Sequence, residues 1–291
     1  METNQLQIET LVAIVDRGTF DAAASQLHIT PSAVSQRIRA LEHSVGRLLV
    51  TRATPCRPTA AGEVLVRAGR QSQLLYNEAR RSLAADRSTE LTVVVNADSL
   101  ATWFRDVLDE AASWDRVALR LHVEDQAHSH ELLRSGDVLA AVTSEPEPVQ
   151  GCTVERLGSL RYVAAASPAF TARWCHGRTP PWREMPMVIF NDKDTLQHDM
   201  LRLHGVSQPP PVVHRVPASA DFQEALRRGL GWGAMPEPQF RDDVAEGRLV
   251  RLASRHKLDI TLYWQHWRLQ STLLAGLTDV VRRAARAHLR P

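Results

Sequence analysis

The sequence predicts an α+β protein in three parts: a small helical unit with a two-stranded ribbon, one long helix, and a two-lobed α/β unit. Three observations support this division. Residues 1–58 hold short helical patterns and a turn-rich segment, residues 59–88 keep one continuous helical stripe, and residues 89–291 alternate strand-like and helix-like segments. A length of 291 residues fits about two globular domains.

Two short helices joined by a tight turn are predicted within residues 19–42. Thr30 suits the N-cap of the second helix and Pro31 suits its first position, so that helix should begin there. Apolar side chains recur at helical spacing in both helices: Phe20, Ala23, Ala24 and Leu27 in the first, and Val34, Ile38 and Leu41 in the second. The pair is therefore a candidate helix-turn-helix.

The outward face of the second helix carries short polar and basic side chains. Side chains of this kind on the second helix of a helix-turn-helix read base edges in the major groove. An ordinary helical hairpin with a solvated polar face is the alternative. The candidate DNA-contacting residues on this helix are Thr30, Ser32, Ser35, Gln36, Arg37 and Arg39, of which Arg37 flanks the apolar stripe.

A β-ribbon is predicted at residues 47–59. A short apolar strand at 48–50 leads to a turn at 54–55, after which the chain returns. A ribbon beside a helix-turn-helix is a wing, and Arg52 and Arg57 on it are candidates for phosphate or minor-groove contacts. Either arginine alone is typical of a solvated surface, but the two together favour DNA. Since the net charge is only +2, binding would rest on a few placed arginines and on two copies of the unit.

A spaced set of residues runs through this region: Phe20, Ala23-Ala24, Leu27, Pro31-Ser32-Ala33-Val34-Ser35, Ile38, Leu41-Glu42, Gly46, Leu48-Leu49, Thr59 and Gly62. This set resembles the N-terminal signature of the LysR-type transcriptional regulators. Strings farther along resemble the ArgP/LysG-like branch, which responds to basic amino acids: VNADSLATWF (95–104), residues 123–152, EALRRGLGWGAMPE (224–237) and LYWQHWRLQS (262–271). The resemblance covers essentially the whole chain. It implies a double-stranded DNA operator, a small amino-acid effector and RNA polymerase as partners, and activation of a basic-amino-acid exporter gene.

Residues 60–88 predict a single long helix. Its apolar stripe consists of Val64, Leu65, Ala68, Gln71, Leu74, Leu75, Ala79 and Leu83. Such a helix cannot bury its stripe alone, so it pairs with a second copy or packs on its own C-terminal domain. The resemblance implies a homodimer through this linker helix, and leaves dimer or tetramer open. Residues 86–89 are the expected hinge.

Strand-helix alternation from residue 91 predicts a mostly parallel sheet with helices on both faces. The expected strands are 91–96, 118–124, 138–143, 187–190, 211–216, 231–235 and 258–265, and the expected helices are 98–111, 128–135 and 271–289, with others beginning near Asp194, Ser219 and Pro236. A crossing is expected near 160–166. Two lobes joined by two crossing strands resemble the type 2 periplasmic-binding-protein fold, with lobe 1 at about 91–160 plus 266–291 and lobe 2 at about 161–265.

Ligands of open α/β sheets sit beyond the C-terminal ends of strands, where helix N-termini also point. The candidate effector-binding residues at such positions are Asn96, Asp98, Ser99, Glu124, Asp125, Thr143 and Ser144 in lobe 1, and Phe190, Asn191, Asp192 and Ser219 in lobe 2. Serine hydroxyls and backbone N–H groups can hold an α-carboxylate, and the acids can hold an α-ammonium and a distal cation. This chemistry suits a zwitterion with a cationic tail, and the resemblance to the branch that responds to basic amino acids makes L-lysine or L-arginine the expected effector.

Several alternatives stay open at this point. Asp98 could serve only as a helix cap, and Asp125 or Asp192 only as a solvated loop charge. Trp264 and Trp267 are interpreted as crossing-strand packing rather than as a stacking platform. The rival functions are a LysR-type regulator of a different small metabolite, and an architectural DNA-binding protein without an effector.

Enzymatic and metal-dependent functions find no support in the sequence. It contains no G-x-S-x-G, H-E-x-x-H, Walker A or G-x-G-x-x-G motif, so we expect no catalytic residues and no cofactor. Cys56, Cys152 and Cys175 lack metal or disulfide spacing, which indicates the reducing cytoplasm. No signal peptide and no membrane-spanning apolar run are expected.

Overall fold

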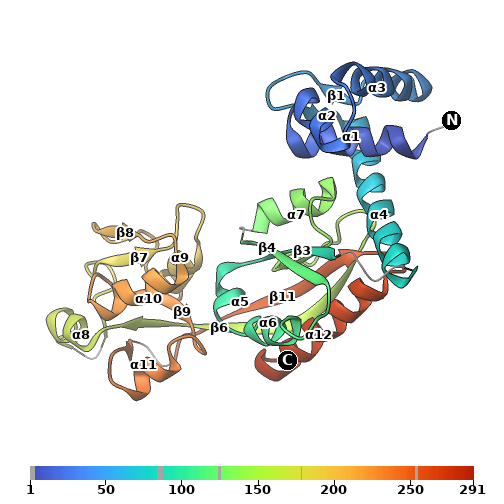
Figure 1. The fold of residues 1–291 in the computed structure, drawn as a ribbon. Coiled ribbons are helices and arrows are strands. Elements are labelled where there is room, and N and C mark those ends of the chain that lie inside the picture. The colour runs from blue at the N-terminus through green and yellow to red at the C-terminus, as the bar shows by residue number, and fades with distance from the viewer. Residues whose placement is uncertain (1–3, 84–87, 124–125, 178, 253–254) are drawn as a thin grey trace.

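The computed structural model describes residues 4–83, 88–123, 126–177, 179–252 and 255–291. Figure 1 shows a helical unit at the N-terminal end, the long helix α4 (Ala60–Leu83) leading away from it, and two lobes joined by the strands β6 (Cys152–Ala166) and β11 (Leu258–Trp267). The hydrophobic cores follow this division, because one cluster fills the N-terminal unit, one fills lobe 1 and two lie in lobe 2.

The N-terminal unit consists of three helices and a ribbon: α1 (Gln5–Arg17), α2 (Phe20–Leu27), α3 (Pro31–Val45), β1 (Val50–Thr51) and β2 (Arg57–Pro58). The predicted start of α3 is confirmed, because the Thr30 side chain accepts a hydrogen bond from Ala33 N at 3.2 Å and Pro31 is the first helical residue. The predicted stripe of Val34, Ile38 and Leu41 is fully buried.

The ribbon differs from its prediction at the first strand. Val50 pairs with Pro58 and Thr51 with Arg57, so β1 begins at Val50 rather than at Leu48. Leu48 is 71% exposed and lies outside the strand. Its neighbour Leu49 is buried, and Leu49 O accepts from Thr59 N at 2.9 Å, so it anchors the ribbon to the start of α4. The sequence prediction relied on apolar character alone and therefore placed the start of this strand too early.

Helix α4 (Ala60–Leu83) contacts both the N-terminal unit and lobe 1. Its Leu74 belongs to the core of lobe 1, and its Glu78 accepts hydrogen bonds from Ser271 Oγ and from Leu273 N at the start of α12 (Thr272–His288). Other apolar side chains of this helix remain exposed: Val64, Leu75, Tyr76 and Leu83. The stripe is thus partly buried on its own domain and partly open. Of the expected hinge, Asp86 and Arg87 lie outside the described residues, and Thr89 already belongs to β3.

The Arg70 guanidinium on α4 joins three parts of the molecule. It pairs with Asp16 of α1 and with Asp137, whose carboxylate lies 2.8 Å away, and it donates to Ser135 O at 3.0 Å. Ser135 is the last residue of α7 (Gln126–Ser135) in lobe 1. The N-terminal unit, the linker helix and lobe 1 therefore meet at one side chain.

Lobe 1 is built on parallel strands, with β3 between β4 and β5. Its elements are β3 (Thr89–Val95), α5 (Ala97–Ala101), α6 (Arg105–Ala111), β4 (Val117–Val123), α7 (Gln126–Ser135), β5 (Ala140–Thr143) and α12 (Thr272–His288). The single helix predicted over 98–111 is wrong, because the chain leaves helical geometry at Thr102. Trp103 and Phe104 are buried there against each other, and the core contact decides the break.

Two long strands cross between the lobes, β6 (Cys152–Ala166) and β11 (Leu258–Trp267), which pair antiparallel over their length. The remaining elements belong to lobe 2: α8 (Pro168–Trp174), β7 (Met187–Ile189), α9 (Leu196–Leu203), β8 (Val213–Arg215), α10 (Ser219–Arg227), β9 (Gly233–Pro236), α11 (Arg241–Ala245) and β10 (Val250–Arg251). The large sheet is mixed rather than mostly parallel, because β11 pairs antiparallel with β5 and β6 pairs antiparallel with β9 and β10. The helix expected near Pro236 begins at Arg241, since Pro236 is held in β9 opposite Tyr162.

Tryptophans fill the cores of both lobes. Trp264 and Trp267 are buried in lobe 1, where their indole N–H groups donate to Thr278 Oγ1 at 3.1 Å and Leu133 O at 3.2 Å. The interpretation of these two residues as packing is confirmed. Trp182 and Trp232 are buried in lobe 2, in edge contact at 4.8 Å between ring centroids.

None of the helices in the described part of the chain combines the length and the apolarity that a bilayer crossing requires.

Candidate functional site

The exposed face of α3 presents most of the polar side chains that the sequence analysis selected. Thr30, Ser32, Gln36 and Arg39 are exposed, and Ser35 is half-buried. Arg37 is directed differently, because it is half-buried and its Nη1 donates to Thr10 Oγ1 of α1 at 3.4 Å. Arg37 therefore ties α3 to α1, while the N-terminal turns of α3 leave a polar surface free for a partner.

The ribbon places two arginines beside that surface. Arg52 and Arg57 are exposed, and the Arg52 guanidinium lies 5.7 Å from the centroid of the Phe20 ring on α2. Cys56, at the base of the ribbon, is buried, and its N–H donates to Gly18 O at 2.7 Å. The ribbon is thus anchored to the helices and directs its basic side chains outward.

A cavity of about 850 Å³ lies between the two lobes. It is lined on the lobe 1 side and along the crossing strands by Asn96, Ala97, Asp98, Val123, His130, Ser144, Glu145, Glu147, Tyr162, Ile260 and Leu262. The lobe 2 side supplies Phe190, Asn191, Lys193, Asp194, Thr195, Leu196, Gln197, Asp199, Ser219, Phe222, Ala234, Met235 and Gln239. This volume is within the range of small-molecule sites.

Asp98 is the acidic side chain of the cavity with the most strongly shifted pKa. Tyr162 Oη donates to its Oδ2 at 2.9 Å. Burial raises the pKa of Asp98 to about 6, the Tyr162 hydrogen bond opposes the rise, and the charge of Asp194 adds to it. The helix-cap role that remained an alternative for Asp98 belongs instead to Asn96, whose Oδ1 accepts from Ser99 N at 2.7 Å. Asp98 is therefore available to a ligand.

Asp194 faces the cavity from lobe 2, and the sequence analysis recognised it only as a helix start. Its carboxylate accepts from Phe190 N at 2.8 Å and Leu196 N at 3.0 Å, and burial raises its pKa. Further acids line the cavity: Glu145, Glu147 and Asp199. The basic side chains of the described lining are Lys193 and His130. The cavity is predominantly acidic and suits a cationic ligand.

The predicted effector residues divide into three groups. Asn96, Asp98, Ser144, Phe190, Asn191 and Ser219 line the cavity. Ser99, Thr143 and Asp192 do not. Ser99 and Thr143 are completely buried, and Asp192 is an exposed side chain paired with Arg215 at 2.7 Å. Glu124 and Asp125 lie outside the described residues.

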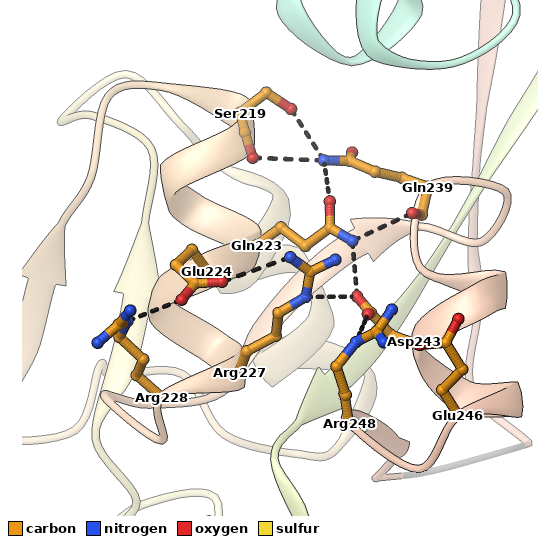
Figure 2. A network of polar contacts seen from close by, with 9 residues as sticks. All are labelled: Ser219, Gln223, Glu224, Arg227, Arg228, Gln239, Asp243, Glu246 and Arg248. Carbon is orange, nitrogen blue, oxygen red and sulfur yellow. Dashed lines mark hydrogen bonds and ion pairs between the residues drawn. The ribbon is translucent and has the colours of Figure 1, made fainter.

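Ser219 belongs to a polar network that leads away from the cavity (Figure 2). Gln239 Nε2 lies 3.1 Å from Ser219 Oγ and 3.3 Å from Ser219 O, and both residues line the cavity. Behind them, Gln223 connects Gln239 to the buried Asp243. Sequence reasoning missed Gln239, because it follows β9 in an irregular turn and carries no periodic signal.

Within the described ranges, no group of three or more His, Cys, Asp or Glu side chains is arranged to hold a metal ion.

The chain is similar to known proteins over its whole length. Residues 6–63 match the family described as bacterial regulatory helix-turn-helix protein, lysR family, and residues 84–286 match the LysR substrate binding domain. The lysine export transcriptional regulatory protein LysG of Corynebacterium efficiens is 50% identical over 291 residues, which cover 99% of each chain. Full-length LysG from Corynebacterium glutamicum with bound effector Arg matches with a TM-score of 0.84 and 46% identity, over 99% of this chain and 100% of that one. ArgP from Mycobacterium tuberculosis matches with a TM-score of 0.89 and 43% identity, over 98% of both.

Proposed function

The chain belongs to the LysR family of bacterial transcriptional regulators, and we propose that its effector is L-arginine or L-lysine, bound in the cavity between the lobes. It is a DNA-binding regulator controlled by a small effector and not an enzyme. The acidic lining of the cavity carries the effector proposal, since an enclosed cation needs a negative partner. The arginine bound by the LysG structure of C. glutamicum supports the same ligand class.

The two ends of the effector meet different chemistry in this proposal. Asp98 and Asp194 approach the cavity from opposite lobes and take the cationic groups. The hydroxyl of Ser219 and the N-terminal turn of α10 take the α-carboxylate, because helix N-termini favour anions. Such a ligand would reduce the repulsion between Asp98 and Asp194 by lying between them.

Calorimetry on the full-length protein tests the effector proposal. L-Arginine or L-lysine should bind one site per chain and raise the melting temperature, since a ligand at about 100 times its dissociation constant adds roughly 2.7 kcal/mol of stability. L-Citrulline is the matched control, because it keeps the shape of arginine without the side-chain charge. Binding of a different metabolite would assign another effector, and no response to any ligand would favour an effector-independent DNA-binding protein.

The proposal also includes the oligomeric state of the protein, a protein partner, the location and the regulated gene. The exposed side chains Val64, Leu75, Tyr76 and Leu83 on α4 support a homodimer through that helix, and the dimer or a tetramer places two DNA-binding units on one operator. We include RNA polymerase as a partner, the cytoplasm as the location and activation of a basic-amino-acid exporter gene as the output. The name of the C. efficiens relative, a lysine export transcriptional regulatory protein, supports an exporter gene as the target.

Gln36→Ala should weaken binding to the operator by about 1–3 kcal/mol and leave binding to random DNA nearly unchanged, because a side chain that reads a base edge contributes only on the cognate sequence. Gel-shift titration on both DNAs measures the difference. His43→Ala, an exposed change in the last turn of the same helix, is the control. Equal losses on both DNAs would exclude base reading by Gln36.

Arg52→Ala and Arg57→Ala should each weaken binding to all DNA sequences and lower the salt dependence of log K by about one unit, because each removes one phosphate contact. Affinities measured from low to moderate salt give this slope. Arg173→Ala, on the exposed surface of α8, should leave the slope unchanged. Unchanged slopes for both wing variants would mean that the ribbon does not contact DNA.

A further inference from the structure

Asp243 on α11 is a completely buried carboxylate that does not line the cavity. Its Oδ1 accepts from Arg248 Nε at 2.6 Å, and its Oδ2 accepts from Gln223 Nε2 at 2.6 Å and from Arg227 Nε at 2.9 Å. Burial raises the pKa of Asp243, but the hydrogen bonds from Arg227, Gln223 and Arg248 outweigh burial and hold it below the usual value. The carboxylate is therefore ionised and fully engaged at neutral pH.

A chain of hydrogen bonds runs from this carboxylate to the cavity wall (Figure 2). Gln223 holds Gln239 at two points, since its Nε2 donates to Gln239 O at 3.2 Å and its Oε1 accepts from Gln239 Nε2 at 3.3 Å. Gln239 Nε2 then reaches the carbonyl and hydroxyl oxygens of Ser219. Asp243 thus fixes a two-glutamine relay that ends on the first residue of α10.

Apart from this relay, side-chain hydrogen bonds give the first turn of α10 little support. Its N-cap residue is Ala218, which provides no side-chain hydrogen bond to the helix N-terminus. The Oε1 of Gln239 is buried without a hydrogen-bond partner in the described part of the chain. The side chain of Gln239 is therefore oriented through its Nε2 alone. The relay determines where this nitrogen and the Ser219 hydroxyl lie.

We infer that Asp243 is a positioning residue for effector binding, which acts through Gln223 and Gln239 to hold Ser219 and the start of α10 for the effector's carboxylate. The inference rests on the proposed function of the cavity. It places a determinant of affinity in α11, two side chains behind the cavity wall. Arg227 and Arg248 serve the relay indirectly, because they balance the buried charge that orients Gln223.

Two variants, at Asp243 and at Gln223, test the inference at successive points of the relay. Asp243→Asn removes the charge with little change of shape, and Gln223→Leu cuts the relay while both arginines stay on Asp243. Each should weaken L-arginine binding by about tenfold, the effect of losing a hydrogen-bonded contact to a charged group. Each should change the binding of L-argininamide, which has no carboxylate, by less than about twofold. Glu246→Gln, which removes only an exposed partner of Arg248, should change neither.

Hydrogen exchange on the effector-free proteins supplies a readout that needs no ligand. Amides of residues 219–222 should exchange faster in both relay variants, and those of α9 should not. Equal weakening of arginine and argininamide would reduce Asp243 to a folding role, and unchanged binding with unchanged exchange would exclude the relay. If the parent protein binds neither L-arginine nor L-lysine, the proposed effector is wrong, and the exchange result still judges the relay.

Discussion

Asp98→Asn should weaken the binding of L-arginine and L-lysine by about 2–5 kcal/mol, because it removes one partner of an enclosed charge pair and leaves the effector's cation without its counter-charge. Calorimetry on the full-length variant measures the loss, and operator binding without effector should stay intact. Asp192→Asn is the matched control, since Asp192 lies outside the cavity and pairs with the exposed Arg215. Parent-like affinity in the Asp98 variant would overturn the role given to Asp98.

The pH dependence of the parent protein gives a second measure of the same residue. The pKa of Asp98 is about 6 in the free protein, so the carboxyl is mostly protonated below that pH and must lose its proton to pair with a cation. Affinity should therefore be constant above about pH 7 and fall by up to tenfold per pH unit below about pH 6. In Asp98→Asn this slope should disappear. A slope that persists would assign the titration to another group, with Asp194 the first candidate.

Gly62→Ala should destabilise the N-terminal unit by about 3 kcal/mol or more, at the upper end of the usual effect of overpacking. A Cβ at this position would lie 1.9 Å from Leu49 O and 2.9 Å from Leu49 C. These are backbone atoms at the base of the ribbon, so they cannot move aside as a flexible side chain would. The start of α4 must separate from the ribbon, and operator affinity should fall together with stability.

Thermal unfolding followed by circular dichroism, together with gel-shift titration, measures both effects of Gly62→Ala. Gly276→Ala on α12 is the control, because nothing lies within 4 Å of its Cβ position. An added methyl there should be neutral or stabilise by up to about 1 kcal/mol, since alanine favours helix over glycine. A Gly62 variant with parent-like stability would mean that α4 and the ribbon can separate at little cost.

The helix-turn-helix could be predicted closely because its signals are local, whereas α1 was not predicted and the first strand of the ribbon was placed too early. Thr30 and Pro31 define the start of α3, and Gly46 ends it in the left-handed conformation. The break between α5 and α6 could not be predicted in this way. The helical pattern continues through Thr102, and only the burial of Trp103 and Phe104 in the lobe 1 core turns the chain.

The cavity between the lobes could be predicted as a location but not in its details. The rule that ligands bind at strand ends correctly placed Asn96, Asp98 and Ser144 at the cavity wall. It selected Asp192 in place of Asp194, because the choice depends on a turn in which the N–H groups of Phe190 and Leu196 close on Asp194. Asp243 lies 20 residues from Gln223, the side chain through which it is proposed to act, and this separation is beyond the reach of any local pattern.

The tryptophans are distributed unevenly between the two ends of the protein. All seven lie beyond residue 100, and five of them are buried in the cores of the two lobes, while the N-terminal unit and α4 contain none. Tryptophan fluorescence, excited where tyrosine does not absorb, therefore reports on the C-terminal lobes alone and does not detect events confined to the DNA-contacting end. A change in emission when operator is added would have to originate in the lobes, so the unmodified protein carries its own probe of communication between its two ends.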